Sequence, residues 1–168
     1  MSGASSTLIS NFEIQSWKTP GTGKCVTIED IVKKIKSNPR YVVHVGTDSH
    51  RNKGNGDNSH IFATVICLYD PGKGATYFYK RFVDKTKYGS IHQRMIAEAT
   101  LSINTSMDLA KYINLSRLVV HSDTNSDCRY PTYKSTEVIR SWVKSLGCKF
   151  KCKPDAWASS SVADWHSK

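Results

Sequence analysis

The sequence predicts an α/β fold in which a mixed five-stranded sheet carries helices on both faces, with an extra helix near the N-terminus. Three observations lead to this prediction. Three consecutive segments of strand character occupy residues 41–84, and helical and strand patterns alternate from there to the end of the chain. The first strand is largely apolar on both faces, which is typical of a strand in the middle of a sheet. Later strands are therefore expected to run parallel to it.

Each element is indicated by a local pattern. The extra helix begins after Thr27, which resembles an N-cap followed by acidic residues, and it ends at Asn38 and Pro39. β-branched or alternating runs between turn residues predict strands at 41–49, 61–70, 76–84, 118–122 and 148–153. Apolar residues at helical spacing predict helices at 90–113 and 132–146, and a short last helix from 159 to the end.

One domain is expected, because 168 residues and 18.8 kDa are an ordinary domain size. Residues 1–25 are expected to form a flexible N-terminal tail and a turn, and residues 26–168 the folded domain. The segment TPGTGK, residues 19–24, superficially resembles a phosphate-binding loop. Lys18 stands where that loop requires its first glycine, and Cys25 where it requires Ser or Thr, so we interpret the segment as a turn.

The chain is strongly basic, with 24 Lys and Arg residues against 14 Asp and Glu and a formal net charge of +10. This balance favours a polyanionic partner, with nucleic acid as the first choice. No apolar run approaches the ~20 residues that cross a bilayer, and the N-terminus lacks the pattern of a signal peptide, so a cytoplasmic protein is expected. The five cysteines include no CxxC pair, which favours reduced thiols over a metal site.

Acidic residues stand where buried strands end. Asp48 follows the run VVHVGT, and Asp123 follows RLVVHS on a later strand. If the two strands are parallel neighbours, their carboxylates stand side by side and raise each other's pKa unless a cation lies between them. Glu98 lies among small and apolar residues of the long helix, where it either points to the sheet end or is solvated. Asp164 lies in AWASSSVADW, a tryptophan-rich segment that is expected to dock on the sheet.

Several segments together resemble the YkuK-like family of ribonuclease-H-like proteins: IEDIVKKIK, VGTDSH, KGATYFY, AEATLS, HSD and CKPDAWASSSVADWHSK. The resemblance spans roughly Val26 to Lys168, and its most specific parts are GTDS and the KPD…ADWHSK ending. It implies the ribonuclease H fold and a metal-binding cluster of four acids, namely Asp48, Glu98, Asp123 and Asp164. The sequence departs from the family after Asp123, where SDCRYPTYKST is longer than the expected glycine-bearing turn.

Carboxylate ligands suit hard cations, so Mg²⁺ or Mn²⁺ is expected rather than zinc. Two such ions about 4 Å apart can activate water and stabilise the departing oxygen of a phosphodiester. In this hypothesis Asp48 bridges the ions, Glu98 and Asp123 complete the first site, and Asp164 holds the second. His166 is a candidate proton donor to the leaving oxygen, or else a polar residue at a helix end.

Lysines alternate with Phe150 and Cys152 near the end of the chain, at positions Lys149, Lys151 and Lys153. They indicate either a surface that grips a nucleic-acid backbone or the protection of an edge strand. The sequence as a whole predicts a metal-dependent nuclease, with the RNA strand of an RNA/DNA hybrid as the expected substrate. Two alternatives stay open: a nucleic-acid-binding module of the same fold without catalysis, and a nuclease for DNA junctions or single strands.

Overall fold

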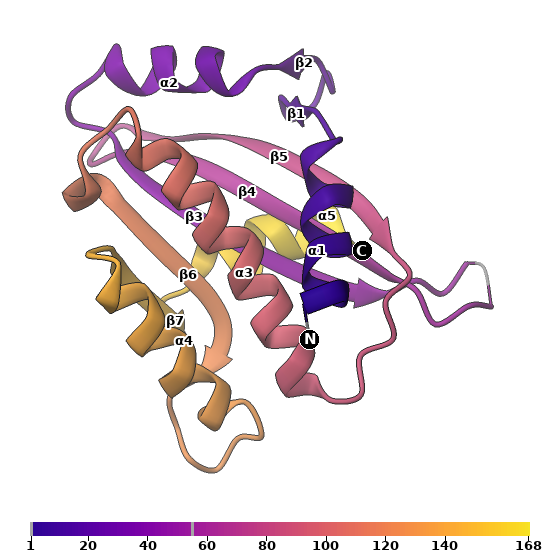
Figure 1. The fold of residues 1–168 in the computed structure, drawn as a ribbon. Helices are drawn as coiled ribbons and strands as arrows, with labels where there is room; N and C mark the ends of the chain where they lie inside the picture. The colour runs from indigo at the N-terminus through magenta and orange to yellow at the C-terminus, as the bar shows by residue number, and fades with distance from the viewer. Residues whose placement is uncertain (1, 55) are drawn as a thin grey trace.

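The computed structural model describes residues 2–54 and 56–168, and Figure 1 shows one mixed sheet with helices on both faces. The predicted α/β class is therefore confirmed. The elements follow in this order: α1 (Ser2–Glu13), β1 (Trp17–Lys18), β2 (Cys25–Val26), α2 (Ile28–Lys36), β3 (Val42–Arg51), β4 (His60–Asp70), β5 (Gly74–Asp84), α3 (Ile91–Ala110), the 3₁₀ turn η1 (Leu115–Arg117), β6 (Leu118–Asn125), α4 (Tyr133–Ser145), β7 (Lys149–Lys153), the π-helical turn η2 (Ala158–Ala163) and α5 (Asp164–Ser167).

Strand β3 is an inner strand of the sheet and the middle one of the five strands that the sequence predicted. The strand order in the described residues is β2-β1-β5-β4-β3-β6-β7. β3 pairs antiparallel with β4 over its whole length, and it pairs parallel with β6 from Val43 opposite Leu118 to Gly46 opposite His121. β6 pairs parallel with β7. Asp48 and Asp123 thus each stand two residues beyond the last parallel pair of β3 and β6.

The sheet has seven strands in the described residues, where the sequence predicted five. The two additional strands, β1 and β2, are two residues long each and form an antiparallel hairpin that extends the β5 edge. Strands this short carry no period-two pattern, so the sequence gives no signal for them. The segment TPGTGK is the hairpin turn, in which Gly21 and Gly23 adopt φ angles of 77° and 65°.

The first 25 residues, expected as a tail and a turn, contain α1 ahead of this hairpin. Leu8 and Phe12 of α1 are buried, and so is Trp17 of β1. The Lys80 ammonium group lies over both rings, 4.4 Å from the centroid of Phe12 and 5.0 Å from that of Trp17. Burial of these apolar side chains and the cation–π contacts hold the segment against β5.

The two faces of the sheet carry different layers. Helices α1, α3 and α4 cover one face, and η2 with α5 covers the other, as Figure 1 shows. Val43 and Val45 of β3 pack into the main apolar core on the α3 side. On the opposite face, a Cβ atom at Gly46 would lie 2.7 Å from the backbone nitrogen of Ser159 in η2. Only glycine therefore allows η2 to pack this closely on β3.

Two buried histidines anchor η2 to the sheet. The amide of Ala158 donates to His121 Nδ1 at 3.0 Å, and His121 Nε2 lies 2.8 Å from His44 Nδ1. Because His121 Nδ1 accepts, its Nε2 carries the proton and donates to His44. Burial lowers the pKa of His44 to about 4 and that of His121 to about 3, so both rings are neutral at pH 7. These rings fix the start of the segment that carries Asp164.

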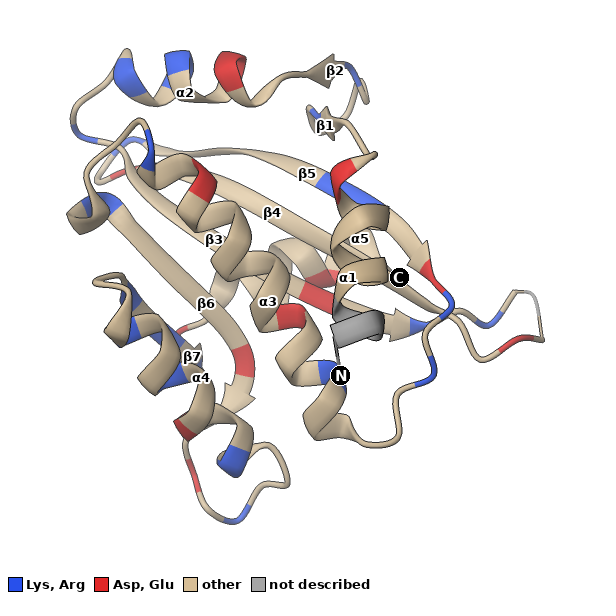
Figure 2. Ribbon diagram, viewed as in Figure 1, with Lys and Arg blue, Asp and Glu red and all other residues tan. Residues whose placement is uncertain are grey.

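The outer helices α2 and α4 each carry more basic than acidic residues, whereas α3 carries more acidic than basic residues and β6 carries Asp123 (Figure 2). None of the helices in residues 2–54 and 56–168 combines the length and apolar character that a membrane span requires.

Candidate metal centre at the end of the central strand

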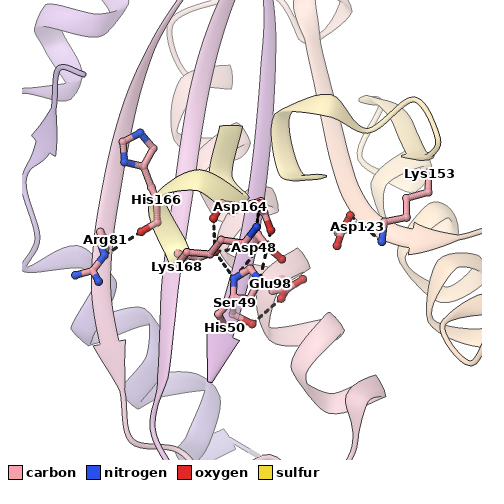
Figure 3. Close-up of polar contacts among 11 residues, drawn as sticks. Asp48, Ser49, His50, Arg81, Glu98, Asp123, Lys153, Asp164, His166 and Lys168 are labelled. Atoms are coloured by element: carbon pink, nitrogen blue, oxygen red, sulfur yellow. Dashed lines mark hydrogen bonds and ion pairs between the residues drawn. The ribbon is translucent and has the colours of Figure 1, made fainter. Parts of the chain in front are cut away.

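A cleft of about 550 Å³ lies at the carboxyl ends of β3 and β6. Three of the predicted acids line it: Asp48 from β3, Asp123 from β6 and Asp164 from the start of α5. Glu98 reaches the same region from α3, as Figure 3 shows. Three of the four predicted acids therefore line one cleft, and Glu98 lies behind it, each on a separate element.

Asp48, His50 and Asp164 form the tightest part of this site. Residues 48 and 50 share one side of β3 because side chains of a strand alternate. His50 Nδ1 lies 3.3 Å from Asp48 Oδ2, and His50 Nε2 lies 3.4 Å from Asp164 Oδ1. One potential ligand atom from each of the three residues lies within 4.8 Å of the other two. Among the residues that the structure describes, these three side chains are the set whose ligand atoms lie close enough together to hold a metal ion.

Ser167 connects the same three residues. Its hydroxyl oxygen lies 2.6 Å from His50 Nδ1, 3.1 Å from Asp48 Oδ2 and 3.1 Å from the carbonyl oxygen of Asp164. Residues 164 and 167 face the same side of α5 because they are three positions apart on a helix. The hydroxyl proton partly compensates the burial of the Asp48 carboxylate.

Glu98 lies behind this group on the α3 side of the sheet. Its side chain is buried, and Oε1 accepts a hydrogen bond from Ser49 Oγ at 2.6 Å. One turn further along α3, the Ser102 hydroxyl lies 2.7 Å from that of Thr47 on β3, which fixes the helix against the strand. Burial raises the pKa of Glu98 well above its usual value, and the charge of Asp48 adds to this increase. Glu98 is thus within electrostatic reach of Asp48 without lining the cleft.

Asp123 lies in an irregular part of β6. His121 pairs with Lys151, but the next pair joins Asn125 to Lys153, so β6 has two more residues than β7 in this interval. Such a bulge redirects side chains, and in Figure 3 Asp123 stands apart from Asp48 and faces Lys153. Lys153 Nζ is 3.2 Å from Asp123 Oδ1. This buried oxygen has no well-aligned hydrogen-bond donor among the described residues.

The acids interact strongly in the absence of a cation. Burial raises the pKa of Asp48 to about 7, and the charges of Asp123 and Asp164 contribute to the increase. Burial likewise raises the pKa of Asp123, while Lys153 opposes this change. The donor set consists of carboxylate oxygens and one imidazole, and ligand atoms of Asp48, His50 and Asp164 lie within 4.8 Å of one another. These properties fit a divalent cation such as Mg²⁺ or Mn²⁺.

The structure does not bring His166 to the acids. Its ring stacks on Tyr79, with centroids 3.9 Å apart, and its Nε2 lies 3.0 Å from the Tyr77 hydroxyl. Its carbonyl oxygen accepts from Arg81 Nε at 2.9 Å. Figure 3 shows the ring pointing away from Asp48 and Asp164. In this position His166 docks α5 on β5.

The three lysines of β7 have different surroundings. Lys149 and Lys151 are exposed, and they alternate with partly buried Phe150 and Cys152 along the edge of the sheet. Lys153 is partly buried, lines the cleft and pairs with Asp123. The structure therefore brings one of the three into contact with the acids.

His50, Ser49 and Ser167 belong to the site but were not among the residues predicted from the sequence. A period-two signal was present for His50, which follows Asp48 by two residues in the same strand. Ser49 belongs to the other side of the strand, where it meets α3. The role of Ser167 had no sequence signal, because it depends on how α5 docks against β3.

The mixed sheet with a central strand ending in acids, and the helices that bring further acids to it, define a ribonuclease-H-like α/β protein. The family model described as Ribonuclease H-like matches residues 26–168, and the chain belongs to this family. This finding confirms the resemblance noted from the sequence motifs. A search among curated proteins finds no match.

Proposed function

We propose that the protein is a nuclease that hydrolyses phosphodiester bonds with the help of divalent cations, Mg²⁺ or Mn²⁺. The observation that carries this proposal is that Asp48, Asp123 and Asp164 line one cleft, with Glu98 behind it and close enough to interact with the charge of Asp48. Burial and the charges of the neighbouring acids raise the pKa of Asp48. The charged form of this carboxyl is therefore unfavourable unless a cation compensates its charge. Membership of the Ribonuclease H-like family supports the proposal, since such a cluster is what the family resemblance implies.

The roles of the side chains follow from their positions. Asp48, Asp164 and His50 would hold one cation, because their ligand atoms are already close together. Asp123 would contribute a carboxylate oxygen from the far side of the cleft, where it now pairs with Lys153, and Glu98 would act on the charge of Asp48 from the α3 side of the sheet. Bound cations of this kind activate a water molecule and stabilise the leaving oxygen. His166 is not included in this proposal, because its ring stacks on Tyr79.

Other residues of the cleft suit a nucleic-acid substrate. Arg94 lines it, and its buried Nε has no hydrogen-bond partner within the described part of the chain. A guanidinium group that lines the cleft offers charged, planar donors to phosphate oxygens. Tyr130, half exposed on the loop after β6, also lines the cleft and offers a surface for a base or sugar. Lys149 and Lys151 would contact the backbone further along the sheet edge.

The RNA strand of an RNA/DNA hybrid is the substrate that we propose first. The test incubates the purified protein with labelled hybrid, RNA duplex, DNA duplex, branched DNA and single strands, each with Mn²⁺, Mg²⁺ or EDTA. We expect cation-dependent cleavage of the hybrid, abolished in Asp48→Asn and retained in Asp127→Asn. Asp127 is a matched control, because its carboxylate pairs with Arg129 on the surface. Cleavage by Asp48→Asn at the wild-type rate would refute the proposed site.

A binding module without catalysis is the second candidate. It is favoured by one observation: Lys153 pairs with Asp123 and Lys168 pairs with Asp164 without any added ion. In that case every substrate stays intact with both cations while oligonucleotides still bind. The same incubations, followed by a binding measurement, therefore separate the two candidates.

A further inference from the structure

Two lysine side chains of the protein lie beside the acids that would hold a cation. Lys168 Nζ lies 2.7 Å from Asp164 Oδ2, and Lys153 Nζ lies 3.2 Å from Asp123 Oδ1. A carboxylate oxygen paired with an ammonium group is less available to a metal ion, because two cations at such a distance repel each other. A divalent ion that uses Asp123 must therefore compete with Lys153.

Lys153 is placed for this competition by the fold. Strand β7 brings it to the cleft, and the bulge of β6 brings Asp123 opposite to it. The side chain of Lys153 is 44% exposed and that of Asp123 is 21% exposed, so the lysine is the partner with more freedom to leave. A half-exposed ion pair contributes little free energy, so breaking it costs less than burying a new charge.

We propose that Lys153 is an exchangeable counter-ion of Asp123. It neutralises this carboxylate until a divalent cation binds there, and binding of the cation releases it. The released ammonium group then faces the cleft and contacts a phosphate of the substrate, so that cation binding and substrate binding become coupled. This inference rests on the proposed function, because it assumes that the acids hold a cation.

The first experiment measures Mn²⁺ affinity by isothermal titration calorimetry without nucleic acid. We expect Lys153→Met to bind Mn²⁺ about three- to fivefold more tightly than the wild type, since it removes the competing charge. Lys153→Arg keeps the charge and should keep the wild-type affinity. Lys149→Met is the matched control on the same strand. It lies about 13 Å further along β7, beyond the screening length of about 8 Å at physiological salt.

Thermal unfolding in EDTA establishes that each variant is folded. Equal Mn²⁺ affinities of the wild type and Lys153→Met, or weaker binding by the variant, would overturn the exchange. Absence of Mn²⁺ binding to all variants would instead overturn the proposed function, and the inference with it. The two failures are therefore distinguishable in one set of titrations.

A second experiment tests the transfer of Lys153 to phosphate. It measures how oligonucleotide affinity depends on salt, with Ca²⁺ or with EDTA. We expect Lys153→Met to reduce the slope of log K against log salt by about 0.7–0.9 in Ca²⁺ and to leave it unchanged in EDTA. A reduction of the same size in both conditions would show that Lys153 binds phosphate without exchange, and no reduction in either would show that it does not bind phosphate.

Discussion

Replacement of Asp48 by asparagine should stabilise the protein in the absence of divalent cations. The Asp48 carboxyl is buried beside Asp123 and Asp164, and its pKa rises from 3.8 to about 7 on folding. Above pH 7 Asp48 is ionised in both states, and its ionisation costs more free energy in the folded protein than in the unfolded chain. At 1.36 kcal/mol per pH unit, this difference corresponds to about 4 kcal/mol. Weakening of the hydrogen bond from Ser167 offsets about half of that gain.

The advantage of asparagine should shrink as the pH falls. A carboxyl with a raised folded-state pKa binds its proton in the folded protein first, so the wild type gains stability as the pH falls from about 7 towards 3.8. We expect Asp48→Asn to be about 2 kcal/mol more stable at pH 8, and this difference to disappear near pH 5. The assay is urea unfolding in EDTA at both pH values.

Two results would refute this reasoning. One is a variant that is less stable than the wild type at pH 8, and the other is a gain that does not change between pH 8 and pH 5. Asp127→Asn is the control, because hydrogen bonds from Arg129 lower the pKa of its surface carboxylate. That replacement should slightly lower the free energy of unfolding rather than raise it.

Three further predictions concern other parts of the structure. Gly46→Ala places a Cβ atom 2.7 Å from the backbone of η2, so thermal unfolding should show that the free energy of unfolding falls by about 1–3 kcal/mol. Gly54→Ala is the control, because its nearest contact would be 3.6 Å away and it should change stability little. Between pH 6.5 and about 4, the unfolded chain takes up a proton at His44 and the folded protein does not, so the wild type loses stability as the pH falls. His44→Gln removes this titration and should flatten the pH dependence of stability in that range by up to about 1.4 kcal/mol per pH unit. Arg94→Gln should weaken oligonucleotide binding in a filter-binding assay and lower its salt dependence by about one phosphate contact.

Most of the sheet could be predicted from the sequence, because its long strands are apolar runs bounded by turn residues. β3, β4, β5, β6 and β7 all lie within a few residues of their predicted ranges. The N-terminal part could not be predicted in the same way. α1 is rich in small polar residues, and its position depends on Leu8 and Phe12 packing against distant parts of the chain. Tertiary contacts determine such an element more than local propensity does.

The candidate site was predicted as a set of acids, but not in its geometry. The period of two in β3 indicated the position of Asp48 and also pointed to His50. His166 was predicted as a candidate proton donor, although helix geometry could have argued against it, since residues two positions apart on a helix do not face the same side. The bulge in β6 had no sequence signal, although it turns Asp123 towards Lys153. Pairing irregularities of this kind depend on two strands at once.

The effect of Asp48→Asn on nucleic-acid affinity can separate a cation-dependent enzyme from a simple binding module. Without divalent cations and at pH 8, where Asp48 is ionised, the acids repel phosphate, so removing one negative charge should tighten oligonucleotide binding in either case. With Ca²⁺ present, an enzyme that holds cations through Asp48 loses a ligand, and the same replacement should weaken binding. A binding module uses no cation, so the replacement should tighten binding under both conditions. Fluorescence anisotropy at fixed ionic strength measures both affinities, and only a change of sign between EDTA and Ca²⁺ is compatible with cations that bridge the acids and the phosphate.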